Sequence, residues 1–259
     1  DHARENELMS FRAPDWLIAR PIAHRGLHDR ARGIIENMPS AIDAAVAGNF
    51  AIEVDLQPSA DNEAMVHHDY ELGRLTQGSG ELLSLTAAQL KQVGFKHTAE
   101  HMMTLGDLCA RVAGRVPLVL EVKSRFDGNR TLVKRMAEVL ASYSGPVVAM
   151  SFDPEQVMAI RKLMPDLPRG IVAERHYTEG EWKQLPPKKT REMTGLRHAF
   201  RTQPHFVSYR VDDLPALAPW IVRNGFGCAL ITWTVRTPEQ RVRTARYADQ
   251  MTFEGFIPE

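Results

Sequence analysis

The segment Ala51-Ile52-Glu53-Val54-Asp55-Leu56-Gln57 sets the architecture that we expect for this chain, because it is an apolar run that carries two carboxylates. Side chains alternate between the two faces of a strand, so Glu53 and Asp55 point the same way. Two carboxylates on one buried face repel each other and lose their hydration. A divalent cation between them would remove that cost; an exposed strand face, or neutralisation by arginines, is the alternative.

The sequence on either side of this strand favours further strands and one helix. Upstream, residues 21–26 read as a short strand, and a helix follows with Asn37 as the expected N-cap and Gly48 as its end. Downstream, residues 59–63 have turn chemistry and lead into a second strand over 64–69, which predicts a hairpin. Residues 70–103 carry glycines and short apolar runs, and we expect them to form an insertion.

From residue 104 onward, strand and helix patterns alternate regularly. Strands are expected at 116–123, 147–152, 170–173, 205–209, 229–235 and 250–253, with helices between them. With the first two strands this makes eight, and repeated strand–helix units form parallel sheets. Eight units in 259 residues predict an α/β fold, a closed (β/α)8 TIM barrel. We expect a single domain over 1–259, with a small insertion after the second strand and a missing or very short last helix.

The composition argues against several classes of protein. The chain is 44% hydrophobic and 25% charged, and its formal net charge is zero. There is no global field to attract nucleic acid and no nucleic-acid motif. No apolar run approaches the roughly 20 residues of a membrane span, so no integral membrane segment is expected. We expect a cytoplasmic protein, although the chain starts at Asp1 and a removed leader peptide stays open; the oligomeric state stays open too.

The two cysteines, Cys109 and Cys228, lie far apart in the sequence and in apolar surroundings. Buried reduced thiols are therefore expected in preference to a disulfide.

Polar side chains gather where the predicted strands end. In a barrel of this kind, catalytic groups lie at the carboxyl ends of the strands. A solvated surface explains one such residue well but explains the coincidence of so many poorly. The residues in question are His24, Arg25, Glu53, Asp55, His68, Glu121 and Lys123; the aromatic residues Phe152 and Trp233 end two further strands.

The order and spacing of these residues resemble the signature series of the glycerophosphodiester phosphodiesterases of bacterial type. The matching segments are His24-Arg25-Gly26, Glu36-Asn37, Glu53-Val54-Asp55, His68-Asp69 and Glu121-Val122-Lys123. The chain departs from the family pattern at Ile35, at Arg236 where asparagine is common, and at Phe253-Glu254-Gly255-Phe256 in place of Thr-Asp-x-Pro. These departures leave the reaction intact and bear on substrate preference.

The resemblance implies metal-dependent hydrolysis of a small-molecule glycerophosphodiester to an alcohol and sn-glycerol 3-phosphate. Glu53, Asp55 and Glu121 offer hard oxygen ligands, which suit Mg²⁺ or Ca²⁺. We expect His24 and His68 to divide the proton transfers, and the sequence leaves open which is acid and which is base. The nucleophile, water or the substrate's own hydroxyl, also stays open.

The remaining candidates have binding or supporting roles. Arg25 and Lys123 would hold phosphate oxygens. Glu36 and Asn37 open a helix, and the resemblance places them near the site as supporting residues. Phe152 and Trp233 fit a core position or a substrate-facing wall equally well. His67 and His68 are adjacent on a strand, so only one can face the site; the motif selects His68 and leaves His67 structural.

Four other interpretations stand beside this one. Within the same fold, phospholipase D-like or lyase activity on lysophospholipids or other phosphodiesters is the nearest alternative, and a catalytically silent phosphodiester-binding module is another. His97-Thr98-Ala99-Glu100-His101 matches the H-x-x-E-H zinc-peptidase pattern, which needs a stable helix, and a chance match is favoured. A basic stretch is most simply a solvated face, with a peripheral contact to anionic headgroups as the alternative; it comprises Lys183, Lys188, Lys189, Arg191, Arg197 and Arg201.

Overall fold

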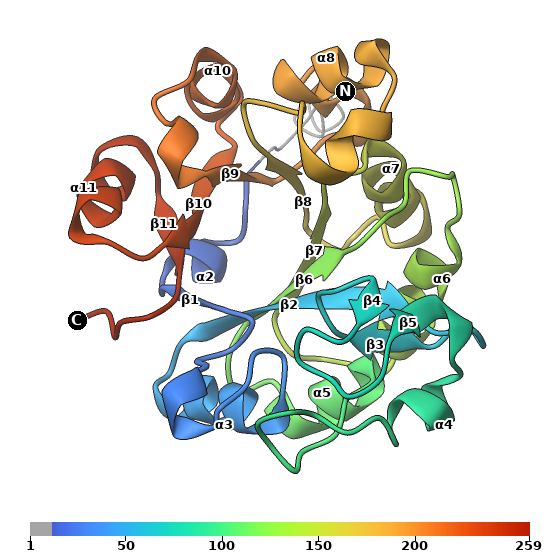
Figure 1. Cartoon of the computed structure of the whole chain (residues 1–259). Helices are drawn as coiled ribbons and strands as arrows, with labels where there is room; N and C mark the ends of the chain where they lie inside the picture. The colour runs from blue at the N-terminus through green and yellow to red at the C-terminus, as the bar shows by residue number, and fades with distance from the viewer. Residues whose placement is uncertain (1–11) are drawn as a thin grey trace.

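Eight parallel strands form a closed barrel in the computed structural model, which describes residues 12–259 (Figure 1). The first strand pairs with the second on one side and with the last on the other, which closes the sheet. The predicted (β/α)8 TIM barrel is confirmed. The barrel strands are β1 (Ile22–His24), β2 (Ala51–Pro58), β6 (Leu118–Val122), β7 (Val147–Ser151), β8 (Arg169–Ala173), β9 (Phe206–Arg210), β10 (Ala229–Val235) and β11 (Gln250–Phe253).

Helices between the strands form the outer ring (Figure 1). Thr104 and Thr237 each begin a helix with a reciprocal capping box, in which side chain and backbone at the two ends of the first turn satisfy each other. The longer helices are α3 (Pro39–Ala47), α5 (Leu105–Val112), α6 (Thr131–Leu140), α7 (Pro154–Leu163), α10 (Leu217–Phe226) and α11 (Pro238–Tyr247). The β8–β9 connection holds η3 (Gly180–Gln184), α8 (Pro187–Thr194) and α9 (Ala199–Thr202). Two short 3₁₀ turns are η1 (Arg30–Arg32) and η4 (Val211–Asp213).

One predicted helix boundary was wrong. The N-cap of α3 is Met38, not Asn37, because Asn37 has a φ of 60° and its side chain binds Asp55 instead of the helix end. Helix α10 runs to Phe226 and ends at Gly227, whose left-handed φ of 70° closes the last turn.

The predicted hairpin and insertion follow β2. Strand β3 (Ala64–Val66) runs antiparallel to β2. Beyond it lie β4 (Glu71–Leu72), β5 (Gly80–Glu81), η2 (Leu82–Ser84) and α4 (Ala87–Leu90), beside the hairpin edge of the barrel (Figure 1). These pieces bury a separate apolar cluster that includes Leu82, Leu90 and Phe95 and reaches Met38 at the start of α3. The insertion is thus anchored next to the β1–α3 connection.

The alternation of β2 and β6 decides which side chains enter the barrel. Ile52, Val54 and Leu56 pack outward with the helix layer in one buried cluster. Ala51 and Val119 face inward with Leu17, whose helix α2 (Asp15–Ile18) precedes β1. Burying a leucine such as Leu17 contributes about 1.5–3 kcal/mol. The interior is therefore apolar toward the amino ends of the strands, and the side chains that follow in the same inward phase are carboxylates.

The end of the chain covers the flank that lacks a helix. In the described residues no helix follows β11. Phe256 packs on Phe253 with ring centroids 5.4 Å apart, and the guanidinium of Arg241 lies over the Phe256 ring. Cys109 and Cys228 are buried free thiols, as predicted. Across residues 12–259, no helix has the length and apolar character needed to cross a bilayer.

Candidate active site

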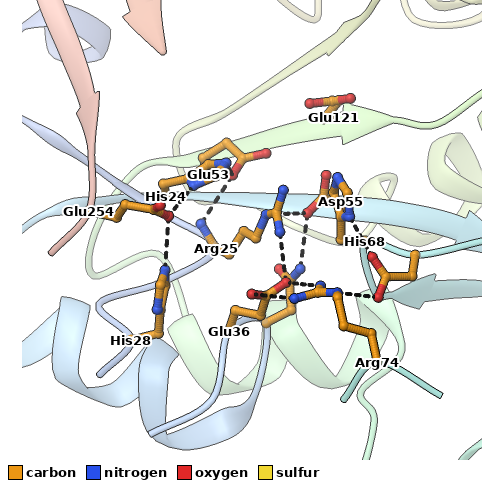
Figure 2. A network of polar contacts seen from close by, with 12 residues as sticks. His24, Arg25, His28, Glu36, Glu53, Asp55, His68, Arg74, Glu121 and Glu254 are labelled. Atoms are coloured by element: carbon orange, nitrogen blue, oxygen red, sulfur yellow. Dashed lines mark hydrogen bonds and ion pairs between the residues drawn. The ribbon is translucent and has the colours of Figure 1, made fainter. Parts of the chain in front are cut away.

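A cavity of about 360 Å³ opens at the carboxyl ends of the strands. It brings together nine residues singled out in the sequence: His24, Arg25, Glu53, Asp55, His68, Glu121, Lys123, Phe152 and Trp233. The other two candidates, Glu36 and Asn37, lie behind its wall and contact Arg25 and Asp55. All eleven positions therefore belong to one neighbourhood, which Figure 2 shows in part.

Three carboxylates form the floor of the cavity. Glu53 and Asp55 come from β2 and Glu121 from the adjacent β6, where Asp55 and Glu121 are register partners. One oxygen of each lies within 4.8 Å of the others, and all three residues are buried. Burial, together with the charges of Asp55 and Glu121, holds the pKa of Glu53 well above its usual range. The basic groups around the cluster therefore do not fully offset the cost of a negative charge on Glu53.

Two basic side chains flank Asp55. Lys123 Nζ lies 3.3 Å from Asp55 Oδ1 and 3.0 Å from a Glu121 oxygen, and Arg25 Nε lies 3.4 Å from Asp55 Oδ2. Burial alone would raise the pKa of Asp55, but Lys123 and Arg25 hold it well below its usual range. The sequence left open whether basic groups neutralise these carboxylates. They lower the pKa of Asp55 in this way, whereas the pKa of Glu53 stays raised.

Arg25 occupies a left-handed turn between β1 and α3. Its φ is 56°, a conformation that costs a non-glycine residue about 1–3 kcal/mol and that clusters at functional sites. The turn aims the Arg25 backbone N–H at Glu53 Oε2, at 3.1 Å. Gly26 follows with a φ of 78°, and a Cβ there would lie 2.9 Å from the backbone of Ala41. Close packing of the turn against α3 therefore requires glycine at this position.

Glu36 and Asn37 hold the turn at Arg25 and the neighbouring Asp55 in place. Glu36 accepts hydrogen bonds from Arg25 Nη1 at 2.7 Å and from Arg74 of the insertion at 2.6 Å. Burial would raise the pKa of Glu36, yet Arg74 and Arg25 lower it to about 2. The Asn37 amide donates to Asp55 Oδ2 at 3.0 Å, and both residues are buried. Glu36 and Asn37 thus contact Arg25 and Asp55, and their supporting role stays a prediction.

His24 is held from behind by Glu254, as Figure 2 shows. His24 Nδ1 lies 2.6 Å from Glu254 Oε2, and the same oxygen lies 3.1 Å from His28 Nε2. Arg236 Nε donates to the other Glu254 oxygen at 2.5 Å. Burial would raise the pKa of Glu254, but hydrogen bonds from His24 and His28 hold it well below its usual range. Since a carboxylate only accepts, Nδ1 of His24 carries the proton.

His68 has a partner of the same kind. Its Nδ1 lies 2.8 Å from Asp69 Oδ1, and Arg74 binds the second Asp69 oxygen at 2.6 Å. His67 points the other way, is buried, and meets the ring of Phe95 edge-on at 6.1 Å. Burial lowers the pKa of His67 to about 4. The sequence-based separation of the two histidines thus agrees with the side on which each lies.

The opposite wall of the cavity is aromatic. Phe152 and Trp233 meet at 5.8 Å, and Trp182 joins them from η3 at 4.9 Å from Phe152. No sequence pattern pointed to Trp182, because it lies in a polar stretch that fits a solvated face. Glu254 and Arg236 stood out in the sequence only as departures from the family pattern; their places at or just after the carboxyl ends of β11 and β10 were the available signal.

The H-x-x-E-H match does not have the structure that it needs. Residues 97–101 form no helix. Arg30 Nη2 and His97 Nε2 lie 2.9 Å apart, and Glu100 accepts hydrogen bonds from the backbone and hydroxyl of Ser40. The favoured interpretation, a chance match, fits these contacts.

This chain is similar to known proteins over most of its length. Residues 24–257 match the model of the Glycerophosphoryl diester phosphodiesterase family. YhdW of Bacillus subtilis (strain 168) is 25% identical over 245 residues, which are 91% of this chain and 92% of YhdW. A glycerophosphodiester phosphodiesterase of Caldanaerobacter subterraneus subsp. tengcongensis is 25% identical over 232 residues, 86% of this chain and 88% of that one.

A solved structure has the same fold. A phosphodiesterase of Oleispira antarctica, in complex with the product sn-glycerol 3-phosphate, has a TM-score of 0.73 at 17% identity, covering 92% of this chain and 93% of that chain. Because the family match spans nearly the whole described chain, the chain belongs to the glycerophosphoryl diester phosphodiesterase family of enzymes.

Proposed function

We propose that this chain hydrolyses glycerophosphodiesters to an alcohol and sn-glycerol 3-phosphate, with a divalent cation and two histidines. The observation that supports this most is the meeting of three buried carboxylates, two histidines and two basic side chains in one cavity of a family member. The similar Oleispira antarctica structure holds sn-glycerol 3-phosphate, the product that this reaction would release.

The donor set fits a hard divalent cation. Glu53, Asp55 and Glu121 supply three oxygens within 4.8 Å of one another, and Mg²⁺ and Ca²⁺ prefer oxygen ligands. Burial and the neighbouring carboxylates Asp55 and Glu121 raise the pKa of Glu53, and a bound cation would relieve both effects. When bound, the cation would draw charge from the phosphoryl oxygens of the substrate. We expect these three residues to hold it, either as Mg²⁺ or as Ca²⁺.

The phosphate group has two further partners. Lys123 offers an ammonium charge above Asp55 and Glu121. Arg25 Nε is buried and makes no hydrogen bond with the described residues, although it lies 3.4 Å from Asp55 Oδ2, and we expect this N–H to donate to a phosphate oxygen. A guanidinium and an ammonium on one phosphate orient it, and they stabilise the negative charge that builds up during the reaction.

We assign the general base to His24. Burial lowers its pKa, with Glu254 partly opposing, so its ring is neutral near pH 7. With Nδ1–H directed at Glu254, the lone pair on Nε2 is available for a proton, and Nε2 lies 4.0 Å from Glu53 Oε2. His68, oriented by Asp69, is then the general acid that protonates the leaving alkoxide.

The test is the identity of the product. ³¹P NMR of a reaction with glycerophosphoethanolamine separates sn-glycerol 3-phosphate, a cyclic phosphate and phosphoethanolamine. The proposal predicts sn-glycerol 3-phosphate as the first product, with attack by water. A cyclic phosphate would show attack by the substrate hydroxyl and lyase chemistry. Binding of the diester without any new phosphorus signal would favour the silent binding module.

A further inference from the structure

The aromatic wall forms a corner of the cavity that the proposed phosphate and cation chemistry does not use. We define the aromatic corner as Phe152, Trp182 and Trp233. Phe152 lies 4.9 Å from Trp182 at 50° and 5.8 Å from Trp233 at 83°, so the three rings face different directions around one space. All three line the cavity and are only half-buried, which leaves ring surface open to a ligand.

Two carboxylates stand beside this corner. Glu174 at the end of β8 is buried, and Glu181 lies next to Trp182 in η3; both line the cavity. Glu174 forms an ion pair with Arg210, whose Nη1 is 3.8 Å away on a side chain that is 47% exposed, and it accepts a hydrogen bond from the Trp182 side chain. Glu181 forms no ion pair among residues 12–259; the charge of Lys123 acts on it, and the Tyr70 side chain is its hydrogen-bond partner. Burial raises the pKa of Glu174, which agrees with incomplete compensation of its charge.

The formal charges of the side chains that line the cavity also leave a negative excess. Its lining holds six carboxylates, the two above with Glu53, Asp55, Glu121 and Asp212, and four basic side chains, Arg25, Lys123, Arg210 and Arg236. A bound divalent cation would balance the excess of two negative charges. A phosphodiester monoanion would then leave one negative charge uncompensated. A substrate that brings its own positive charge makes the filled cavity neutral.

We propose that the aromatic corner, with Glu174 and Glu181, binds an alkylammonium group on the alcohol side of the diester, so that the enzyme prefers choline-like esters. This inference rests on the proposed function, since it concerns the same cavity. An ammonium over aromatic faces is attracted by the negative ring quadrupole, most strongly over tryptophan, and a desolvated site strengthens the attraction. A neutral alcohol of the same shape gains only the apolar contact.

The experiment compares two substrates of equal shape. One is glycerophosphocholine; the other is the 3,3-dimethylbutyl ester of glycerol phosphate, in which carbon replaces the charged nitrogen. We expect kcat/KM to be about tenfold higher for the choline ester. The variants Trp182→Leu and Glu181→Gln should each reduce that ratio to about threefold or less, because each loses an attraction that acts only on the charged ester. Glycerophosphoethanolamine shows whether a primary ammonium serves equally well.

The control variant is Trp220→Leu, which removes an indole that is 60% exposed on α10, away from the cavity. It should keep the wild-type ratio. Equal kcat/KM for the charged and neutral esters in the wild type would overturn the inference, as would an unchanged ratio in both corner variants. Glu181 is exposed, so we expect Glu181→Gln to fold. Its kcat/KM ratio therefore tests the inference even if Trp182→Leu fails to fold. Loss of glycerol 3-phosphate release from every ester would instead contradict the proposed function.

Discussion

Glu254 Oε2 lies 2.6 Å from His24 Nδ1, which joins the carboxyl end of the last barrel strand to the carboxyl end of the first. The carboxylate also contacts His28 and Arg236, so its own position is fixed from three sides. This arrangement sets the tautomer of His24 and directs Nε2 toward the carboxylate floor. A histidine oriented in this way resembles other systems in which an outer carboxylate positions a reactive ring.

Replacing Glu254 by Gln should lower kcat by about 10–100-fold with little change in KM, because the ring stays in place but loses its charged partner. Glu254→Asp should be intermediate, since the charge remains and the reach shortens. Steady-state kinetics with glycerophosphoethanolamine checks this. The control is Glu138→Gln, a carboxylate that is 65% exposed on α6. A wild-type kcat in Glu254→Gln would remove the orienting role.

The proposed division of work between the histidines can be separated by the leaving group. A nitrophenolate leaves without protonation, so His68→Asn should lose about 10²–10⁴-fold in kcat on an alkyl ester but much less on the p-nitrophenyl ester of glycerol phosphate. His24→Asn should lose activity on both esters. Colorimetric and coupled assays on the two substrates give the comparison. The reverse pattern would exchange the roles of the two residues.

The raised pKa of Glu53 has a consequence for stability. An acid whose folded-state pKa lies above the unfolded value loses stability as pH rises from about 4.5 through the folded pKa. At pH 8 with chelator, Glu53→Gln should therefore unfold at a higher temperature than the wild type. Its free energy of unfolding should be larger by about 1.4 kcal/mol for each unit by which the pKa of Glu53 is raised. With excess Ca²⁺ or Mg²⁺ the order should reverse, because only the wild type binds the cation well. Differential scanning calorimetry that shows the wild type more stable in chelator would contradict this.

His198 should make the protein sensitive to mild acid. It is buried, and burial, with Arg201 and Lys189, lowers its pKa to about 3. A histidine with a depressed folded-state pKa contributes stability that is present above about pH 6.5 and is lost as pH falls toward 3. The slope for one such group is about 1.4 kcal/mol per pH unit. Urea unfolding of His198→Gln between pH 7 and pH 4.5 should show a shallower decline than the wild type, with exposed His101→Gln as the control; equal slopes in all three would exclude this role.

Much of this structure follows from period and spacing in the sequence. The inward phase of β2 and β6 is readable because apolar residues alternate with Glu53, Asp55 and Glu121, and a strand can place them only on one face. The helix starts at Thr104 and Thr237 were predictable because capping boxes are local. The N-cap at Asn37 was mispredicted, since a tertiary contact with Asp55 outweighs the local preference.

Other features depend on contacts that no local pattern reveals. Glu254 meets His24 across 230 positions, which only closure of the barrel brings about. Trp182 enters the cavity because the β8–β9 connection folds back over the carboxyl ends of the strands, and its neighbours in the sequence are solvated. Arg74 reaches Glu36 from the insertion, so an apparently separate segment supports the turn at Arg25.

The most direct test of the account is metal-dependent release of sn-glycerol 3-phosphate. The wild type and Glu53→Gln would be treated with chelator, dialysed, and assayed on glycerophosphodiesters while Mg²⁺ or Ca²⁺ is added back. We predict no release in chelator, restoration by at least one of the two cations in the wild type, and at least about 100-fold less activity in the variant. Undiminished release in chelator, or full activity in Glu53→Gln, would contradict a catalytic cation held by Glu53, Asp55 and Glu121.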